Sequence, residues 1–482
     1  MQYQSTRGKT PMVNSAQAVI LGMAGDGGLY LPQELPAFHW QECVAAKPME
    51  MAEMLLSAFL PEIPNMAQLV DKAYRGKFET EDLTPTVKVG DMTVLELFRG
   101  PTSAFKDVAL SMLPQLMTAA RQAEGKTEDV LILTATSGDT GKAALVGFQD
   151  VPGIKICVFY PDGGVSQIQR RQMASQLGEN VTVCAIRGNF DDAQTGVKEI
   201  FARAQEEKLP LALSSANSIN IGRLVPQTMY YFKAYRDLLD RGEISLGDKV
   251  NFSVPTGNFG DILAGYLASK LGLPVGMLVC ASNANDVLTE FLRTGVYSRL
   301  RPFHKTISPS MDILVSSNLE RLLYLESGDA RLVDSLMQQL KDTGRYQVPE
   351  ELFEKIKGQF WGYSSDDAAG KQTVNRVWQA HGYLCDPHTA AAWVAAESYR
   401  EETGDLRPMV VLSTASAYKF PAAVLEALGQ QPERDEFLQM DQLCRLTNVK
   451  IPKNLATLKE MPLRHKDVIG KDEMLDYVRN IR

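Results

Sequence analysis

Excess positive charge and long hydrophobic runs are both absent from this 482-residue sequence. It contains 50 Lys and Arg residues against 58 Asp and Glu, which gives a formal net charge of -8. Because nucleic acids and anionic membranes bind concentrated positive charge, this balance disfavours both as partners. No run approaches the roughly 18 apolar residues of a membrane-spanning helix, and the N-terminus lacks a secretion signal. We therefore expect a cytoplasmic protein in which an anionic ligand would need a locally positive pocket.

Cysteine and histidine are also sparse, and neither is arranged for metal binding. The six cysteines are scattered without a Cys-x-x-Cys pair, and Cys157, Cys184 and Cys280 fall in apolar, strand-like runs. That pattern is typical of small core side chains in a reducing cytosol. The five histidines include no His-x-x-x-His pair. We predict no metal site and interpret His388 as a structural or supporting residue.

Short β-branched runs alternate with helix-length amphipathic segments along most of the chain. This alternation predicts an α/β fold in which crossover helices join parallel strands. The predicted strands span residues 130–135, 154–160, 181–186, 211–214, 250–254, 277–281 and 409–412, and predicted helices include residues 166–177, 191–205, 219–239 and 262–271. Residues 326–380 and 430–482 lack strand alternation, so we expect helical insertions and a helical C-terminal cover there.

Lys106 is presented at a predicted turn from a strand to a helix. It follows the apolar stretch 94–98 and lies in the run 100–107, Gly-Pro-Thr-Ser-Ala-Phe-Lys-Asp. An amine attacks an aldehyde only when it is neutral, and desolvation by Ala104 and Phe105 would favour the neutral form. A solvated surface lysine is the ordinary alternative. The residues around Lys106 nevertheless suit a lysine that forms a Schiff base. The other loops of the chain decide between these two interpretations of Lys106.

The loop 136–141, Thr-Ser-Gly-Asp-Thr-Gly, directly follows a predicted strand. Its glycines allow close approach of an anion, and its hydroxyl and amide groups can donate hydrogen bonds to a carboxylate or phosphate. The spacing does not fit a Walker A loop, because Thr136 and Ala143 stand where that motif needs glycine and a hydroxyl residue. A helix N-cap with tightly packed glycines explains the loop equally well when it is considered alone.

Two further junctions place small polar residues at predicted strand ends. Residues 255–261, Pro-Thr-Gly-Asn-Phe-Gly-Asp, precede a helix and can aim successive N–H groups at one phosphate. At the second junction, Thr414 can donate to or accept from a ring nitrogen. An ordinary turn explains this second junction as well.

Together, the lysine, the glycine-rich cradle, the hydroxyl loop and the terminal threonine describe a pyridoxal-phosphate site of the tryptophan-synthase-β type, fold type II. From residue 15 to residue 420 the sequence resembles the threonine synthase family, and its motifs occur in the family's order. They are residues 104–107, 136–141, 215–220 with Arg223 and Gln227, 257–260, 308–313 with 317–321, and 386–390.

The resemblance implies a specific division of the chain. A fold type II enzyme has two parallel-sheet α/β domains with the cofactor between them. In this sequence we expect an N-terminal substructure over 1–95, a large pyridoxal-phosphate domain over 96–124 and 215–430, a small domain over 125–214 and a C-terminal extension over 431–482. We expect a monomer or weak homodimer.

The resemblance also implies the reaction, the conversion of O-phospho-L-homoserine and water to L-threonine and phosphate with pyridoxal 5'-phosphate. Lys106 would carry the cofactor and, once substrate displaces it, move protons at the α and β carbons. The cofactor phosphate would bind to Gly257, Asn258, Phe259, Gly260 and Asp261, and the pyridine nitrogen to Thr414.

The substrate has two anionic ends, and the resemblance suggests a place for each. Residues expected around the α-carboxylate are Ser103, Thr136, Ser137, Asp139 and Thr140, and those expected around the phosphate are Asn217, Ser218, Asn220 and Arg223. Lys142 is a second candidate cation for the phosphate. Many fold type II relatives have Asn where this chain has Asp139. An ionised Asp139 carboxylate would repel the phenolic oxygen of the cofactor. We therefore do not expect Asp139 to contact that oxygen directly unless it is protonated or hydrogen-bonded elsewhere.

Two alternatives stay open at this point. A related pyridoxal-phosphate enzyme, either a phospholyase or a dehydratase, would end at 2-oxobutyrate, although a dehydratase needs no phosphate-binding cluster around Arg223. A non-catalytic homologue that binds ligand without turnover is disfavoured by the intact Lys106 and the complete cradle.

Overall fold

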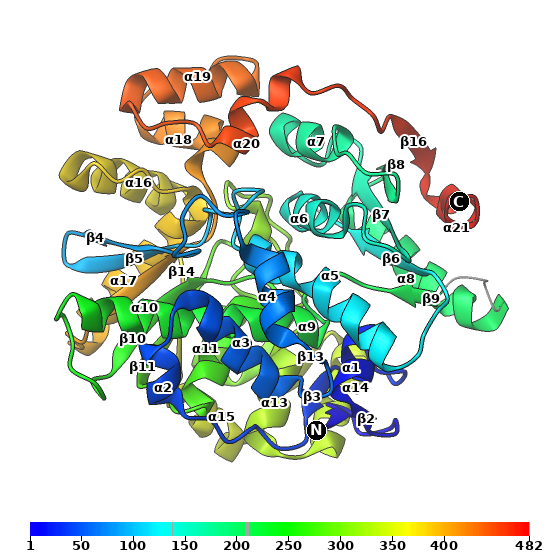
Figure 1. The fold of residues 1–482 in the computed structure, drawn as a ribbon. Helices are drawn as coiled ribbons and strands as arrows, with labels where there is room; N and C mark the ends of the chain where they lie inside the picture. Colours follow the sequence, from blue (N-terminus) through cyan, green and yellow to red (C-terminus); the bar gives the residue numbers. More distant parts are fainter. Residues whose placement is uncertain (137, 208–211, 482) are drawn as a thin grey trace.

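Two parallel β-sheets, each flanked by helices, form the body of the protein (Figure 1). The computed structural model describes residues 1–136, 138–207 and 212–481. In Figure 1 the larger sheet lies on the left and the smaller sheet on the right, with helix α5 (Lys106–Ala123) between them. We call the larger sheet with its helices the large unit and the smaller sheet with its helices the small unit. Helix α5 contacts α1 (Ser15–Leu21) and α4 (Met66–Tyr74) from the N-terminal segment, α9 (Ile221–Leu224) from the large unit and α6 (Asp139–Phe148) from the small unit. It therefore joins all three parts of the chain.

The large sheet has six strands in the order β14-β11-β10-β15-β5-β4. These are β14 Phe360–Ser364, β11 Val275–Ser282, β10 Val250–Pro255, β15 Met409–Ser413, β5 Met92–Glu96 and β4 Thr86–Val89. All neighbours are parallel except the edge pair β4 and β5. Alternate residues of β15 face opposite sides: Val410 and Leu412 join one core cluster, and Val411 joins another. This period of two buries both faces of the sheet.

The small sheet has five parallel strands in the order β16-β8-β7-β6-β9. These are β16 Asp467–Gly470, β8 Val181–Arg187, β7 Ile154–Pro161, β6 Val130–Ala135 and β9 Ala212–Ser214. Its helices are α6 Asp139–Phe148, α7 Gln167–Ala174, α8 Phe190–Glu207 and α21 Met474–Arg479. All seven predicted strands are present across the two sheets, with ends within two residues of those expected.

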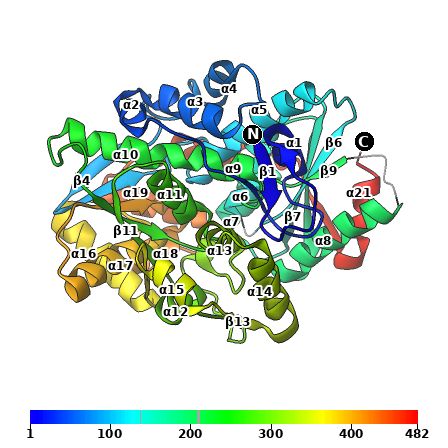
Figure 2. The ribbon, with the colours of Figure 1, turned by 90° about the horizontal axis from the view of Figure 1, so that it is seen from below.

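The N-terminal segment forms a three-stranded antiparallel sheet and a group of helices. The strands are β1 Gln2–Ser5, β2 Val13–Asn14 and β3 Tyr30–Pro32, and the helices are α1 Ser15–Leu21, α2 Trp40–Ala45, α3 Pro48–Phe59 and α4 Met66–Tyr74. Helices α2 and α3 contact α10 (Thr228–Asp240) of the large unit, as Figure 2 shows from below. The N-terminal segment thus packs against helix α10 of the large unit.

The remaining elements cover the large unit and connect the two ends of the chain. They are α9 Ile221–Leu224, η1 Val225–Gln227, α11 Gly260–Lys270, α12 Val287–Thr294, β12 Val296–Ser298, η2 Pro309–Met311, α13 Leu319–Ser327, α14 Ala330–Thr343, β13 Arg345–Gln347, α15 Glu350–Lys357, α16 Asp367–His381, α17 Pro387–Thr403, η3 Ala417–Lys419, α18 Pro421–Ala427, α19 Glu436–Thr447, α20 Lys453–Ala456, η4 Leu458–Glu460 and η5 Lys471–Glu473. Among the helices described, none is both long enough and apolar enough to cross a bilayer.

Several expectations about the fold were wrong. The C-terminal cover is not wholly helical, because β16 extends the small sheet beside β8. Strands β13 and β14 likewise lie in a region expected to be helical. The predicted helix over 219–239 is divided into α9, η1 and α10, because Pro226 lacks the N–H that a continuous helix needs. The first strands of the large sheet in chain order are β4 and β5, and residue 95 lies inside β5.

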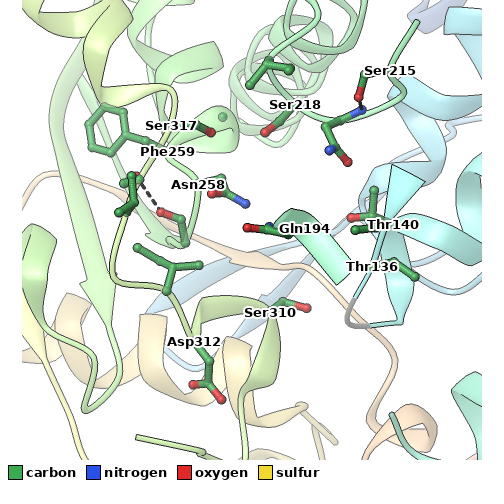
Figure 3. A pocket seen from close by; sticks show the side chains of 18 of the residues that line it. Thr136, Thr140, Gln194, Ser215, Ser218, Asn258, Phe259, Ser310, Asp312 and Ser317 are labelled. Atoms are coloured by element: carbon green, nitrogen blue, oxygen red, sulfur yellow. Dashed lines mark hydrogen bonds between the residues drawn. The ribbon is translucent and has the colours of Figure 1, made fainter. Parts of the chain in front are cut away.

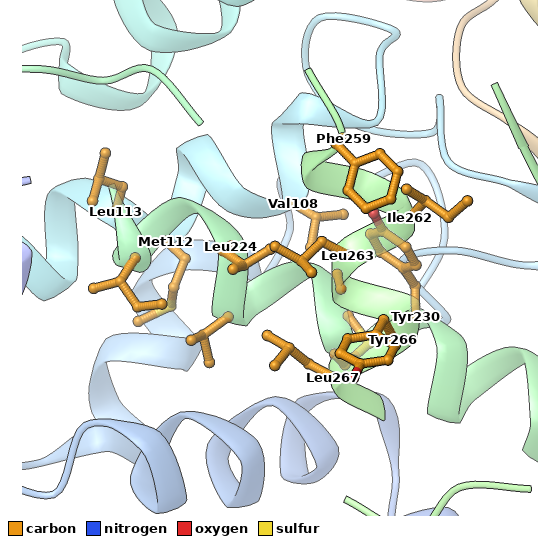
Figure 4. Packing of buried hydrophobic residues seen from close by; sticks show 14 of the residues in the cluster. Val108, Met112, Leu113, Leu224, Tyr230, Phe259, Ile262, Leu263, Tyr266 and Leu267 are labelled. Carbon is orange, nitrogen blue, oxygen red and sulfur yellow. The ribbon is translucent and has the colours of Figure 1, made fainter. Parts of the chain in front are cut away.

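A continuous apolar cluster fixes α5 relative to α11. Figure 4 shows Val108, Met112 and Leu113 of α5 near Leu224 of α9, and the group continues to Leu263 of α11. Each of these side chains is at most 1% exposed. Close packing makes such a cluster stiff. The first residue of α5, Lys106, is therefore held in a defined position relative to the first turn of α11.

Candidate active site

A cavity of about 1740 Å³ lies between the two sheet units. Its walls include the loops that follow β6 and β10, the end of β15, and residues from the N-terminal segment. Figure 3 shows Asn258 and Ser310 of the large unit on one side, and Thr136 and Thr140 of the small unit opposite. The carboxyl ends of parallel strands are where α/β folds bind ligands. The cavity is therefore the candidate site.

Lys106, the first residue of α5, reaches into this cavity. The turn before it is held against the segment after β15: the Phe105 N–H donates to the Thr414 carbonyl at 2.8 Å, and Ala104 forms an isolated bridge with Ala415. Burial lowers the pKa of Lys106 to about 8, Asp139 opposes this shift, and the cations Lys419 and Arg223 add to it. About a tenth of the amine is then neutral at pH 7, far more than at the ordinary lysine pKa, and a Schiff-base nucleophile needs this neutral form.

The turn between β10 and α11 is shaped to hold an anion. A Cβ on Gly257 would come within 2.6 Å of the Ser310 carbonyl oxygen, so only glycine fits there. The Ser316 hydroxyl donates to the Gly257 carbonyl at 2.8 Å, and the Asn318 side chain donates to the Asn258 carbonyl at 3.0 Å. The first N–H groups of α11 have no acceptor within the helix, and the helix dipole favours negative charge at this end. These features fit a phosphate group.

Asp261, in the first turn of α11, also lines the cavity. Its Oδ1 accepts hydrogen bonds from the Tyr230 and Tyr231 hydroxyls, whereas its buried Oδ2 has no partner among the described residues. Burial raises the pKa of Asp261 to about 7. A protonated Oδ2 can donate a hydrogen bond to an anion, so this orphaned atom also fits a bound phosphate.

Arg223 is a buried cation without a countercharge. It is 2% exposed, lines the cavity and donates from Nη1 to the Ala216 carbonyl. Its buried Nε has no acceptor, and no carboxylate lies within ion-pair distance in the described part of the chain. Burial lowers the pKa of Arg223 to about 10, so it stays charged at neutral pH. An uncompensated buried charge is unfavourable unless a ligand neutralises it. Arg223 therefore marks a position for an anion.

The loop after β6 is ordered by its own first residue. The Thr136 hydroxyl oxygen accepts from the N–H groups of Gly138 at 3.0 Å and Gly141 at 2.9 Å. Thr136 and Thr140 line the cavity. Ser137, which the sequence also assigned to this site, lies outside the described residues. Directly after β15, Thr414 also lines the cavity.

Comparison with known proteins places this cavity in a family. Residues 81–415 match the family described as pyridoxal-phosphate dependent enzymes, residues 2–74 match the threonine synthase N terminus, and residues 389–478 match the threonine synthase C-terminal region. The chain belongs to the threonine synthase family. A threonine synthase from Pseudomonas aeruginosa is 37% identical over 481 residues, which cover 96% of this chain and 98% of that protein.

Solved threonine synthases share the whole fold. A structure from Brucella melitensis, solved with pyridoxal phosphate bound, is 39% identical with a TM-score of 0.88, and covers 100% of this chain and 99% of its own. The yeast threonine synthase structure is 31% identical with a TM-score of 0.89, and covers 100% of this chain and 98% of its own. The predicted fold type II architecture and pyridoxal phosphate as cofactor are thereby confirmed.

Most of the site residues that the sequence predicted line this one cavity. They are Lys106, Thr136, Thr140, Asn217, Ser218, Arg223, Gly257, Asn258, Phe259, Gly260, Asp261 and Thr414. Three others do not line it. The Ser103 hydroxyl donates to Asn454, the Asn220 side chain caps α9 and donates to the Val19 carbonyl, and Asp139 pairs with Lys419. Protein groups already engage these three side chains.

Further contacts at the cavity were not predicted, although His388 and Asn318 lie in the motifs 386–390 and 317–321. His388 lines it and accepts the Ser310 N–H at 3.1 Å. Arg7 of the N-terminal segment lines it and pairs with Glu320 at 2.9 Å. Asn318 holds the phosphate turn from outside. Each contact joins residues far apart in the chain, so no local pattern could have revealed it.

Proposed function

We propose that this protein is the threonine synthase of its cell, converting O-phospho-L-homoserine and water to L-threonine and phosphate. Membership of the family supports the reaction class. The observation that carries the proposal is that Arg223, a buried cation without a countercharge, lines the same cavity as Lys106 and the phosphate turn. One cavity thus offers one position for the cofactor phosphate and a second for an anionic substrate group.

The described residues suggest how pyridoxal phosphate is held. Lys106 supplies the amine for covalent attachment, residues 257–261 supply the phosphate turn, and Thr414 supplies a neutral hydroxyl for the pyridine nitrogen. When bound, the cofactor supplies an electron sink for negative charge that develops on the substrate. A neutral hydroxyl does not hold the ring nitrogen protonated as a carboxylate would. The cofactor ring would therefore withdraw electrons less strongly.

The substrate is oriented by its two anionic ends. Thr136 and Thr140 lie at the small-unit wall, where their hydroxyls can donate to the α-carboxylate. Arg223, with Asn217 and Ser218, is placed for the phosphate, and the free Nε gives it a donor to use. Fixing both ends restricts how the α, β and γ carbons lie relative to Lys106, and such positioning selects among possible outcomes.

Lys106 then acts as the proton carrier. Its amine, when not attached to the cofactor, would remove protons at the α and β carbons of the substrate. The phosphate leaves from Cγ, water adds at Cβ, and protons return to Cγ and Cα. With a pKa of about 8, Lys106 can both take and give protons near neutral pH.

The test is to incubate purified protein, loaded with pyridoxal phosphate, with O-phospho-L-homoserine while measuring phosphate and L-threonine. Equal release of both products is expected. Phosphate with 2-oxobutyrate in place of threonine would replace the proposal with a phospholyase. A dehydratase would instead act on threonine or serine, and neither is expected to react.

We further propose a cytoplasmic enzyme that is a monomer or weak homodimer. All six cysteines are free and five are buried, which suits a reducing compartment. We propose that the two sheet units act as its domains, with the N-terminal segment and the C-terminal extension packed on them. Light scattering after gel filtration tests the oligomeric state.

A further inference from the structure

A buried ion pair joins the two sheet units beside Lys106. Lys419 Nζ lies 2.5 Å from Asp139 Oδ1, and the two side chains are 0% and 3% exposed. Asp139 begins α6 of the small unit, and Lys419 ends η3, which follows β15 of the large unit. The pair therefore crosses between the units.

Both partners are anchored by neutral groups as well. Lys419 Nζ donates to the Thr102 carbonyl at 3.2 Å, in the turn that leads to Lys106. Gln169 Nε2 donates to Asp139 Oδ1 at 3.0 Å. The ionised pair lowers the pKa of Asp139, although burial opposes this. Asp139 is thus an ionised carboxylate that is paired with Lys419.

Stability alone is a poor explanation for such a pair. The free-energy cost of desolvating two charges offsets most of their Coulombic attraction. Replacing a buried ion pair by apolar residues therefore often leaves the stability of a protein unchanged or increases it. The location suggests a different role. Asp139 belongs to the loop expected to hold the substrate carboxylate, and its charge raises the pKa of Lys106, whereas Lys419 lowers it.

We propose that Lys419 is a positioning residue that compensates the charge of Asp139, docking the first turn of α6 on the large unit and leaving the electrostatic field at Lys106 nearly balanced. The inference rests on the proposed function, because it treats this loop and Lys106 as parts of one site. It explains how an aspartate is tolerated where an uncompensated carboxylate would repel the phenolic oxygen of the cofactor.

Other charged groups surround the same point and stay constant in the test. Lys106 also interacts with Asp107 of its own helix and with Arg223 of α9. Lys142 of α6 interacts with Lys419 and Asp107, and Asp261 of α11 interacts with Lys106. None of them lies within ion-pair distance of Lys419 in the described structure, so the variants below alter one pair only.

The experiment is a double-variant cycle on the holoenzyme. Lys419→Gln, Asp139→Asn and the double variant are loaded with pyridoxal phosphate, and the visible band of the bound cofactor is followed against pH. In Lys419→Gln the unpaired Asp139 carboxylate would stabilise positive charge on the Lys106 nitrogen. The midpoint of the pH titration of the visible band should therefore rise by about 1–2 pH units. In Asp139→Asn the bare ammonium should lower it by a similar amount. The double variant should return close to wild type.

A matched control is Lys371→Gln with Glu426→Gln, an exposed pair at 2.6 Å that should leave the midpoint unchanged. Shifts of the same sign in both single variants, or no shift in either, would overturn the proposal. If the single variants do not fold, the double variant decides: a folded holoenzyme with the wild-type midpoint supports the proposal, and an unfolded or shifted one rejects it. The expected midpoint shifts without threonine formation would contradict the proposed reaction but not the charge compensation between Lys419 and Asp139.

Discussion

The Nδ1 atom of His388 lies 2.6 Å from Oδ2 of Asp386, and both side chains are buried. Because Nε2 accepts the Ser310 N–H, the proton lies on Nδ1, and the imidazole is neutral. Ser310 in turn packs its carbonyl against Gly257. A chain of contacts therefore runs from the first turn of α17 to the turn assigned to the cofactor phosphate.

Replacing His388 should weaken cofactor binding. His388→Ala removes the acceptor of the Ser310 N–H, and a lost buried hydrogen bond of about 1–1.5 kcal/mol predicts roughly tenfold weaker binding of pyridoxal phosphate. His388→Gln, which can present an amide oxygen to the same N–H, should recover part of the affinity. Fluorescence titration of the apoenzyme measures both. Equal affinity in wild type and His388→Ala would show that the turn needs no support from α17.

Gly257 and Gly260 form a matched pair for testing the phosphate turn. A Cβ on Gly257 would meet the Ser310 carbonyl at 2.6 Å, whereas one on Gly260 would meet the Ser218 Cβ at 3.4 Å. Overpacking against backbone costs about 1–3 kcal/mol, so Gly257→Ala should lower cofactor affinity about tenfold or more. Gly260→Ala should have a much smaller effect. Similar losses in both variants would argue against the steric explanation.

Covalent attachment of the cofactor should depend on the protonation of Lys106. Below pH 8 the amine is mostly charged and cannot attack, and above pH 8 it is mostly neutral. The rate at which apoenzyme and pyridoxal phosphate form the visible band should therefore rise with pH and level off above about 8. Lys106→Ala should form no band and have no turnover. A band in that variant would assign attachment to another lysine.

Arg223 should contribute to substrate binding more than to cofactor binding. Charge-assisted hydrogen bonds are worth about 1.5–3 kcal/mol, so Arg223→Ala should raise KM for O-phospho-L-homoserine about 10- to 100-fold. Steady-state kinetics and cofactor titration separate the two roles. Arg376→Ala, at an exposed arginine paired with Glu397, is the control. A large loss of cofactor affinity with unchanged KM would move Arg223 to the cofactor phosphate.

The sequence predicted the parallel sheets well because each buried strand is a compact β-branched run. It failed for β16, where only Val468 and Ile469 are apolar and the pairing partner β8 lies far back in the chain. The site shows the same contrast. Local motifs pointed to Lys106 and to the turn 257–261, all of which line the cavity, whereas the direction of a side chain depends on distant neighbours. Asp139 turns to Lys419 for that reason, although its loop borders the cavity.

Asp261 should make the apoenzyme less stable as pH rises. Its pKa is about 7 in the folded protein and near 4 when unfolded, so between these values the native state binds the extra proton. The free energy of unfolding should then fall by about 1.4 kcal/mol per pH unit from this group, with the loss complete above pH 7. Asp261→Asn, which still accepts from Tyr230, should lack this contribution. Urea unfolding of both apoproteins at pH 5 and pH 8 measures it, and parallel pH dependence in the two would show that Asp261 titrates normally.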